Sequence, residues 1–407
     1  MIPAQDRRTL RDLATRVAEA ASQPIMAERR AMWARHNRLE RVRPMILVFP
    51  EGSWAELLPD AVLVCTSAEG RDVEAALRRR LYYQDHIHDD TVIENTWEVP
   101  PVVAVTGWGL QPRHIDATQE RGSWAFDPVV REASDLDALR YPEVTYDAEA
   151  TRREHEQALE LFGDILDVQR RGVRRISFHL GRLYADLRGL DQFMWDMYDH
   201  PDMIHRAMRF FSEGYRRYLQ QIVDLGLLDV NNDGTYHSSG GVGYTDELPA
   251  EGYRPGQARF ADLWASAESQ ELALVSPAQH EEFVLQYERE LLEPFGLNGY
   301  GCCEDLTHKL ERVLTVRNMR RISISPWADV RQCAERLGRR AIFSWKPNPA
   351  YLVGQFDAGQ TREYLGQALE ATRGCVVEVI LKDTHTCEHH PERFTEWTQV
   401  ARELAEG

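Results

Sequence analysis

The chain has 407 residues, with 65 acidic against 48 basic side chains and a formal net charge of −17. This charge repels phosphate backbones and anionic lipid head groups, which argues against a general nucleic-acid or membrane-surface binder. The length suits either two or three average domains or one α/β barrel, because such barrels routinely run this long.

The six cysteines do not indicate a disulfide scaffold, because the chain is long and has no signal peptide or short secreted framework. No apolar run approaches the roughly 20 residues needed to span a bilayer. We therefore expect a cytoplasmic protein with reduced thiols.

Residues 9–21 and 27–41 predict two helices, since apolar side chains recur there every three or four positions. We interpret residues 1–44 as an N-terminal helical extension that could supply a homodimer surface. The apolar run 45–49 predicts a buried strand. Further strand candidates lie at 61–65 and, as irregular strands or a hairpin, within 91–109, whereas the polar segment 113–146 predicts a loop.

A regular alternation of elements begins at residue 148. Helices are predicted over 149–170, 190–199 and 201–225, and another begins at Ser276-Pro277, an N-cap followed by proline. Strands are predicted over 175–180, 227–230, 295–300, 321–325, 341–345 and 376–381. Six or more alternating units favour a closed (β/α)8 TIM barrel over an open sheet, so residues 45–407 are predicted to form one barrel. No G-x-G-x-x-G motif follows the first strand.

The active site of an α/β barrel is built at the carboxyl ends of its strands, which narrows the search for chemistry. Only three basic residues are lysines, and two of them, Lys346 and Lys382, fall at predicted strand ends. Either could bind an anionic substrate or form an ion pair. The candidate catalytic residues are Asp233, Tyr300, Glu304 and Lys382, and the candidate substrate-binding residues are His179, Asn232, His237, Trp345 and Lys346.

Thiols and imidazoles also gather at predicted strand ends. Cys302 and Cys303 end one strand, and His385 and Cys387 end another about eighty residues later. Such groups are ligands that zinc prefers, and a catalytic zinc site commonly has three protein ligands. The alternative is that these cysteines simply pack, as free cysteines often do. Because adjacent cysteines rarely point the same way, we expect only one of the pair to bind a metal.

Four stretches carry a resemblance to a known family: the strand and turn at 178–181, the polar strand end at 229–233, the Ser-Pro helix start at 274–277 and the Asn-x-Pro-like turn within 343–349. With the segments around them, residues 165–405 resemble the uroporphyrinogen decarboxylase-like superfamily. That superfamily includes methyltransferases that act with corrinoid proteins and thiols.

The resemblance implies a zinc site in which Cys302 matches the cysteine of a His-x-Cys motif and Tyr300 replaces the histidine. Cys387, or His385 beside it, matches a late cysteine of the family. Cys303 or Glu304 could supply the missing ligand. The arginine-containing segment that binds substrate in the decarboxylases is not reproduced at residues 50–54.

The resemblance therefore implies transfer of a methyl group between a corrinoid (cobalamin) protein and a small thiol, pterin or methyl ether, with or without zinc. Without zinc, Tyr300, Glu304 and His237 could activate the substrate. Two alternatives stay open: a cofactor-independent decarboxylase or lyase of the same fold that uses Asp233 or Lys382, and a non-catalytic protein that binds a corrinoid or tetrapyrrole.

Overall fold

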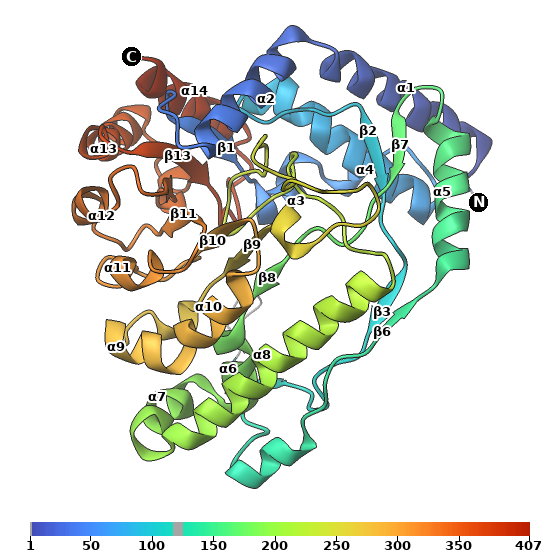
Figure 1. Cartoon of the computed structure of the whole chain (residues 1–407). Helices are drawn as coiled ribbons and strands as arrows, with labels where there is room; N and C mark the ends of the chain where they lie inside the picture. Colours follow the sequence, from blue (N-terminus) through green and yellow to red (C-terminus); the bar gives the residue numbers. More distant parts are fainter. Residues whose placement is uncertain (1, 117–124) are drawn as a thin grey trace.

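The computed structural model of the chain describes residues 2–116 and 125–407. A central sheet of seven parallel strands runs through the molecule with helices around it (Figure 1). The strand order is β1-β13-β12-β11-β10-β9-β8. The strands are β1 (Met45–Val48), β8 (Ser177–Phe178), β9 (Trp264–Ala267), β10 (Leu297–Tyr300), β11 (Met319–Ile324), β12 (Ile342–Trp345) and β13 (Val376–Leu381).

The predicted α/β class with a parallel sheet is confirmed, but closure into an eight-stranded barrel is not. Within the described ranges no ladder joins β1 to β8. The expected strand 227–230 makes one bridge, between Val173 and Leu228. Tyr236 lies between the two open edges of the sheet. The centroid of its ring lies 5.2 Å from the ring centroid of Phe49 at the end of β1. It lies 6.0 Å from the guanidinium carbon of Arg175, which precedes β8.

The loop that carries Tyr236 packs closely against the sheet. Gly240 has a φ of +140°, and a Cβ atom there would lie 2.7 Å from the side chain of Ile380 in β13. At Gly241, a Cβ atom would lie 2.6 Å from Arg321 of β11. The close approach therefore requires glycine at both positions, and it brings Ser239 to the carboxyl edge of the sheet.

Fourteen α-helices occur in the described residues. The buried apolar side chains of the sheet and surrounding helices form the main core, and α1, α4 and α5 share a second core that includes Leu10, Leu77 and Phe162. The helices are α1 (Ala4–Ala21), α2 (Pro24–Asn37), α3 (Trp54–Leu57), α4 (Ala68–Tyr82), α5 (Ala148–Phe162), α6 (Leu180–Arg188), α7 (Leu190–Asp199), α8 (Pro201–Asp224), α9 (Pro277–His280), α10 (Gln286–Leu292), α11 (Leu310–Val313), α12 (Val330–Leu337), α13 (Ala358–Ala371) and α14 (Glu392–Glu406).

The two N-terminal helices are confirmed by α1 and α2. The domain boundary at residue 44 stays a prediction. In the part of the chain that the structure describes, no helix has both the length and the apolar character needed to cross a bilayer.

Several local predictions were wrong. The expected helix 149–170 ends at Phe162, and β7 (Asp167–Arg170) pairs instead with β2 (Thr96–Val99), a non-local contact that the helical pattern could not reveal. The expected strand 61–65 is not a strand, because the amides of Val64 and Cys65 donate to the carboxylate of Glu74.

The segment 113–146 is not all loop, although residues 117–124 lie outside the described chain. It contributes strands to two small antiparallel sheets. These sheets consist of β3 (Val103–Val105) with β6 (Val144–Tyr146), and of β4 (Arg113–Ile115) with β5 (Ala125–Asp127).

Candidate functional site

Polar side chains from five segments meet at the carboxyl edge of the central sheet. They follow β8, β9, β10 and β13, with one more from the loop that packs against the sheet. Because parallel strands present their carboxyl ends at one edge, residues far apart in sequence become neighbours there. We call this group the edge cluster, and it consists of His179, Ser239, Glu268, Cys302, Cys303, Lys382 and Asp383.

Cys302 is at the centre of these contacts. Its Sγ lies 3.5 Å from the Sγ of Cys303 and 3.5 Å from the Oγ of Ser239. The ammonium of Lys382 donates to the same Ser239 oxygen at 3.2 Å and lies 3.5 Å from Asp383. A thiol, a hydroxyl and a cation therefore adjoin one another at the rim of the sheet.

These neighbours favour the ionised form of Cys302. The hydrogen bond from Cys303 is the main cause, and the Ser239 hydroxyl and the charge of Lys382 add to it against the effect of burial, so the pKa of Cys302 is lowered to about 6. The pKa of Cys303 is raised, because the hydrogen bond that it shares with Cys302 and the loss of hydration at its sulfur both disfavour its ionised form. One thiolate can therefore persist in the pair at neutral pH.

His179 and Glu268 form a second pair within the edge cluster. The Nδ1–H of His179 donates to Glu268 Oε1 at 2.6 Å, and the imidazole side chain is 42% exposed whereas the carboxylate is 10% exposed. Burial disfavours the imidazolium, but the Glu268 hydrogen bond and the negative charges of Glu268, Glu271 and Cys302 outweigh it and raise the pKa of His179. An accessible imidazole is thus kept protonated at higher pH than a free one.

The turn after β10 aims Cys302 at this group. Gly301 has a φ of +97°, and a Cβ atom there would lie 2.7 Å from the side chain of Leu306, so glycine is needed. Glu304 accepts hydrogen bonds from the backbone amides of Cys302 and Ser269 at 2.7 and 3.1 Å. Burial and the nearby charge of Glu268 raise the pKa of Glu304 to about 7. Glu304 therefore positions the turn.

Tyr300 lies beneath the edge cluster and is fully buried. Its hydroxyl donates to Glu288 at 2.6 Å and lies 2.8 Å from His280 Nε2 and 3.1 Å from Ser269 Oγ. Burial raises the pKa values of Tyr300 and Glu288 well above their ordinary range. Since its hydroxyl is satisfied by protein groups, Tyr300 supports the strand end from below.

Of the other predicted substrate-binding residues, His237, Trp345 and Lys346 are buried and Asn232 is half-buried. His237 is buried, stacks on Trp264 and bonds to the carbonyl of Asn231, while burial lowers the pKa of His237 to about 3. Asn232 donates to the carbonyl of Leu248. Trp345 is buried in the core, and the ammonium of Lys346 donates to Ser344. Burial lowers the pKa of Lys346 to about 7.

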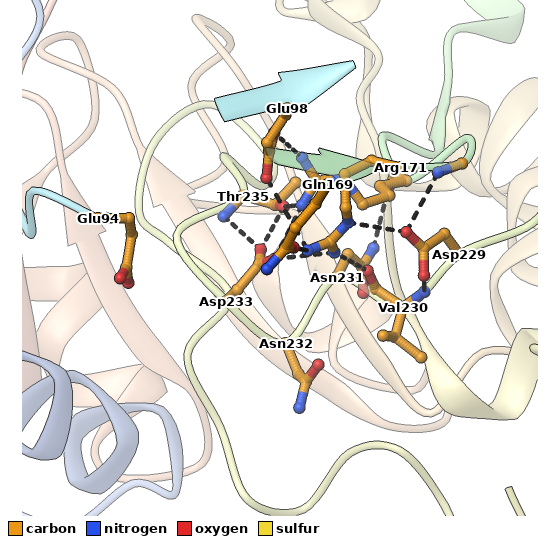
Figure 2. Close-up of polar contacts among 12 residues, drawn as sticks. Glu94, Glu98, Gln169, Arg171, Asp229, Val230, Asn231, Asn232, Asp233 and Thr235 are labelled. Carbon is orange, nitrogen blue, oxygen red and sulfur yellow. Dashed lines mark hydrogen bonds and ion pairs between the residues drawn. The ribbon is translucent and has the colours of Figure 1, made fainter. Parts of the chain in front are cut away.

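Asp233 belongs to an arginine network rather than to the edge cluster. Its carboxylate accepts from Arg171 at 3.0 Å and from Arg174 at 2.8 Å. Figure 2 shows Asp233 together with Asp229 and Glu98 around Arg171. Burial opposes ionisation of Asp233, but the Thr235 hydrogen bond and the two arginines outweigh it and lower its pKa. Asp233 therefore acts as a fixed negative charge.

The four predicted metal ligands do not come together. Cys302 and Cys303 are neighbours, but the Sγ of buried Cys387 donates to Glu56 at 3.1 Å, and His385 is exposed with its backbone against Gly52. Among residues 2–116 and 125–407, no group of three or more His, Cys, Asp or Glu side chains is arranged to hold a metal ion. Lys382 also places a positive charge beside Cys302. These residues do not fit a zinc centre in this arrangement.

Ser239, Glu268 and Asp383 were not among the candidates from sequence. Glu268 was missed because β9 was missed: its Trp264-Ala265-Ser266-Ala267 run is short and lacks β-branched residues. Ser239 could have been suggested by the following Gly240-Gly241 pair, which indicates close backbone packing. Asp383 directly follows Lys382, and its role as a neighbour of Cys303 becomes visible only in three dimensions.

No family model and no curated protein matches the sequence of this chain. Among solved structures, the chain is similar to a methyltransferase from Methanosarcina mazei, with a TM-score of 0.51 and 14% sequence identity. The alignment covers 91% of this chain and 97% of that one. At this identity the similarity concerns the fold, which both chains share over nearly their whole length.

Proposed function

We propose that the protein is a methyltransferase whose reaction takes place at the edge cluster. The fold shared with the Methanosarcina mazei methyltransferase supports this proposal. The observation that carries it is local: an accessible imidazole, bonded to a buried carboxylate, lies within electrostatic range of a thiol of lowered pKa. In detail, we propose methyl transfer between a corrinoid carried by a partner protein and the heteroatom of a small substrate, with a methyl ether best suited to proton donation.

His179 is the proposed proton donor. When a methyl group leaves an ether oxygen for a reduced corrinoid, the oxygen keeps the electron pair of the broken bond and needs a proton. A donor with a pKa near or above neutrality can supply it, and in the reverse direction the same group takes the proton back. Glu268 orients the imidazole through Nδ1, which leaves Nε2 to face the substrate.

Cys302 and Lys382 set the charge around His179. Lys382 favours the Cys302 thiolate, and that thiolate favours the protonated form of His179. In this scheme Cys302 is a positioning residue that acts through His179. The active form has both charges present, so activity should require a pH above about 6, where Cys302 ionises, and should fall as His179 loses its proton.

Zinc held by Cys302 together with Cys387 or His385, with Cys303 or Glu304 as a further ligand, is the alternative that the family resemblance suggests, and elemental analysis tests it. A catalytic zinc site predicts about one zinc per chain in the wild-type protein and none in Cys302→Ser. That result would indicate that zinc, rather than the charge of Lys382, stabilises the Cys302 thiolate. The scheme above contains no metal-dependent step, and it expects activity to survive chelation.

The proposal is tested with free corrinoids. Cob(I)alamin is mixed with 3-methoxybenzoate in one experiment and methylcobalamin with 2-mercaptoethanol in another, and the cobalt–carbon absorption is followed. We expect the wild-type protein to accelerate at least one reaction, and His179→Gln to lose that acceleration. Perturbation of the corrinoid spectrum without turnover in either direction would contradict the proposal and favour a corrinoid-binding protein.

A further inference from the structure

A cavity of about 900 Å³ opens on the side of the molecule where the sheet is not closed. One part of its wall comes from α4 and residues 91–103, which follow β1 in sequence. The other comes from residues 169–175, which lead into β8, and from residues 233–235. The volume lies within the range typical of small-molecule sites, about 300–1,000 Å³. We call it the arginine cavity.

The lining of the arginine cavity is basic although the chain as a whole is acidic. Five arginines and three carboxylates line it among the described residues, in a chain with a net charge of −17. A local excess of positive charge against this background attracts anions. The arginines are Arg79, Arg80, Arg171, Arg174 and Arg175, and the carboxylates are Glu94, Glu98 and Asp233.

The carboxylates are all engaged by arginines that hold the walls together. Glu98 and Asp233 pair with Arg174. Asp233 also pairs with Arg171, and Figure 2 shows these two residues near Glu98. Glu94 forms a two-pronged pair with Arg30, which is not part of the lining. Among the described residues, these carboxylates are therefore ion-paired with other arginines than Arg79, Arg80 and Arg175, although Glu94 and Glu98 still stabilise the charge of Arg80.

Those remaining arginines are stacked on aromatic rings. The guanidinium of Arg79 lies 5.5 Å from the ring of Trp54, and that of Arg175 lies 6.0 Å from the ring of Tyr236. Arg80 lies 5.6 Å from the ring of Trp97 and donates to the carbonyl of Thr96. Within residues 2–116 and 125–407, none of the three forms an ion pair with a carboxylate. Stacking limits guanidinium motion, so less entropy is lost when an anion binds.

We propose that the arginine cavity binds a small organic anion that carries two or more carboxylate or phosphate groups. Guanidinium groups form paired hydrogen bonds with both kinds of group, and Arg79 with Arg80 on one segment and Arg175 on another can engage separate ends of such a ligand. The half-buried side chain of Arg80 and the prolines Pro100 and Pro101, which also line the cavity, suit the carbon skeleton of such a ligand. This site does not depend on the proposed methyl transfer.

The test measures binding of two probes, citrate for carboxylates and pyrophosphate for phosphates, by isothermal titration calorimetry at low ionic strength. We expect the wild-type chain to bind at least one probe. Arg79→Gln and Arg175→Gln should each weaken that binding about tenfold or more, because each removes a charge-assisted contact. Arg373→Gln is the matched control: Arg373 is exposed, pairs with Glu370 on α13 and should leave binding unchanged.

Preference for one probe identifies the group that the site recognises. Absence of measurable binding of both probes at millimolar concentration would overturn the proposal. Binding that persists equally in Arg79→Gln and Arg175→Gln would overturn it too, because the anion would then lie elsewhere. Thermal unfolding of each variant checks that it is folded. Methyl-transfer activity is measured in the same variants and in the wild type, and it should be equal in all of them whether it is present or absent. The anion-binding result therefore does not depend on whether the proposed function is correct.

Discussion

The edge cluster and the arginine network both bring cations and anions together, yet they differ in the groups that carry the charge. Around Arg171 and Arg174, guanidinium groups face carboxylates. The ordinary pKa values of both kinds of group lie far from neutrality, so their charges are fixed near pH 7. At the edge cluster, two thiols and an imidazole lie among one lysine and two carboxylates. The ordinary pKa values of a thiol and an imidazole lie nearer to 7. One neighbouring charge or hydrogen bond can therefore change their protonation within the physiological pH range.

This difference separates a structural network from a candidate reactive one. Substitution in the arginine network should change stability and leave proton transfer unaffected, whereas substitution in the edge cluster should do the opposite. Three substitutions test that separation.

The largest expected effect is that of His179→Gln on methyl transfer. Loss of a positioned general acid typically lowers the rate about 10²–10⁴-fold, and since His179 is partly exposed, the stability should change little. Cobalamin turnover and urea unfolding measure the two quantities. His155→Gln on α5 serves as the control variant; a similar loss of activity there, or none in His179→Gln, would remove His179 from the reaction.

Asp233→Asn should destabilise the fold by about 1–3 kcal/mol, because Arg171 and Arg174 would lose a charged partner. The pKa of Asp233 lies below its ordinary value of 3.8, so its stabilising effect is present above that pH and is lost as the pH falls through the folded-state pKa. Urea unfolding at pH 7 and pH 3 should therefore show a difference from wild type that shrinks in acid. A destabilisation of equal size at both values would contradict this explanation.

Lys382→Met should raise the pKa of the Cys302 thiol by about one pH unit, or about 1.4 kcal/mol, because it removes the nearest positive charge. The rate of alkylation by iodoacetamide at pH 6 should fall about fivefold, because the thiolate fraction drops from about a half to about a tenth. Arg373→Gln again controls for a change in net charge, and an unchanged rate in Lys382→Met would show that the lysine does not act on the thiol.

Much of the scaffold follows from sequence, because local patterns determine it. The run 376–381 matched β13 in full, and the Ser276-Pro277 start was confirmed by a capping box between Ser276 and Gln279. Closure of the barrel was not confirmed, because the expected strand 227–230 has few ladder contacts and Tyr236 lies at the open edges. No local pattern encodes which segment fills such a gap.

The candidate site was predictable in part for the same reason. Strand-end placement singled out Cys302, Lys382 and His179, since strand ends can be read from hydrophobic runs. The partners that set their protonation, Ser239 and Glu268, come from a glycine loop and an unpredicted strand. Burial excludes other candidates from an accessible site. His237 and Trp345 are of residue types that often bind substrates, but both lie in the core, which the sequence could not reveal.

The pH dependence of Cys302 alkylation tests the central claim most directly. The rate of iodoacetamide labelling at Cys302, quantified by peptide mass spectrometry against buried Cys333, reports the fraction of thiolate at each pH. The charge arrangement at the edge cluster predicts a half-maximal rate near pH 6, in line with the lowered pKa of Cys302. A half-maximal rate near the ordinary thiol value of 9.0 would contradict it, because His179 would then lack the thiolate that helps to keep it protonated.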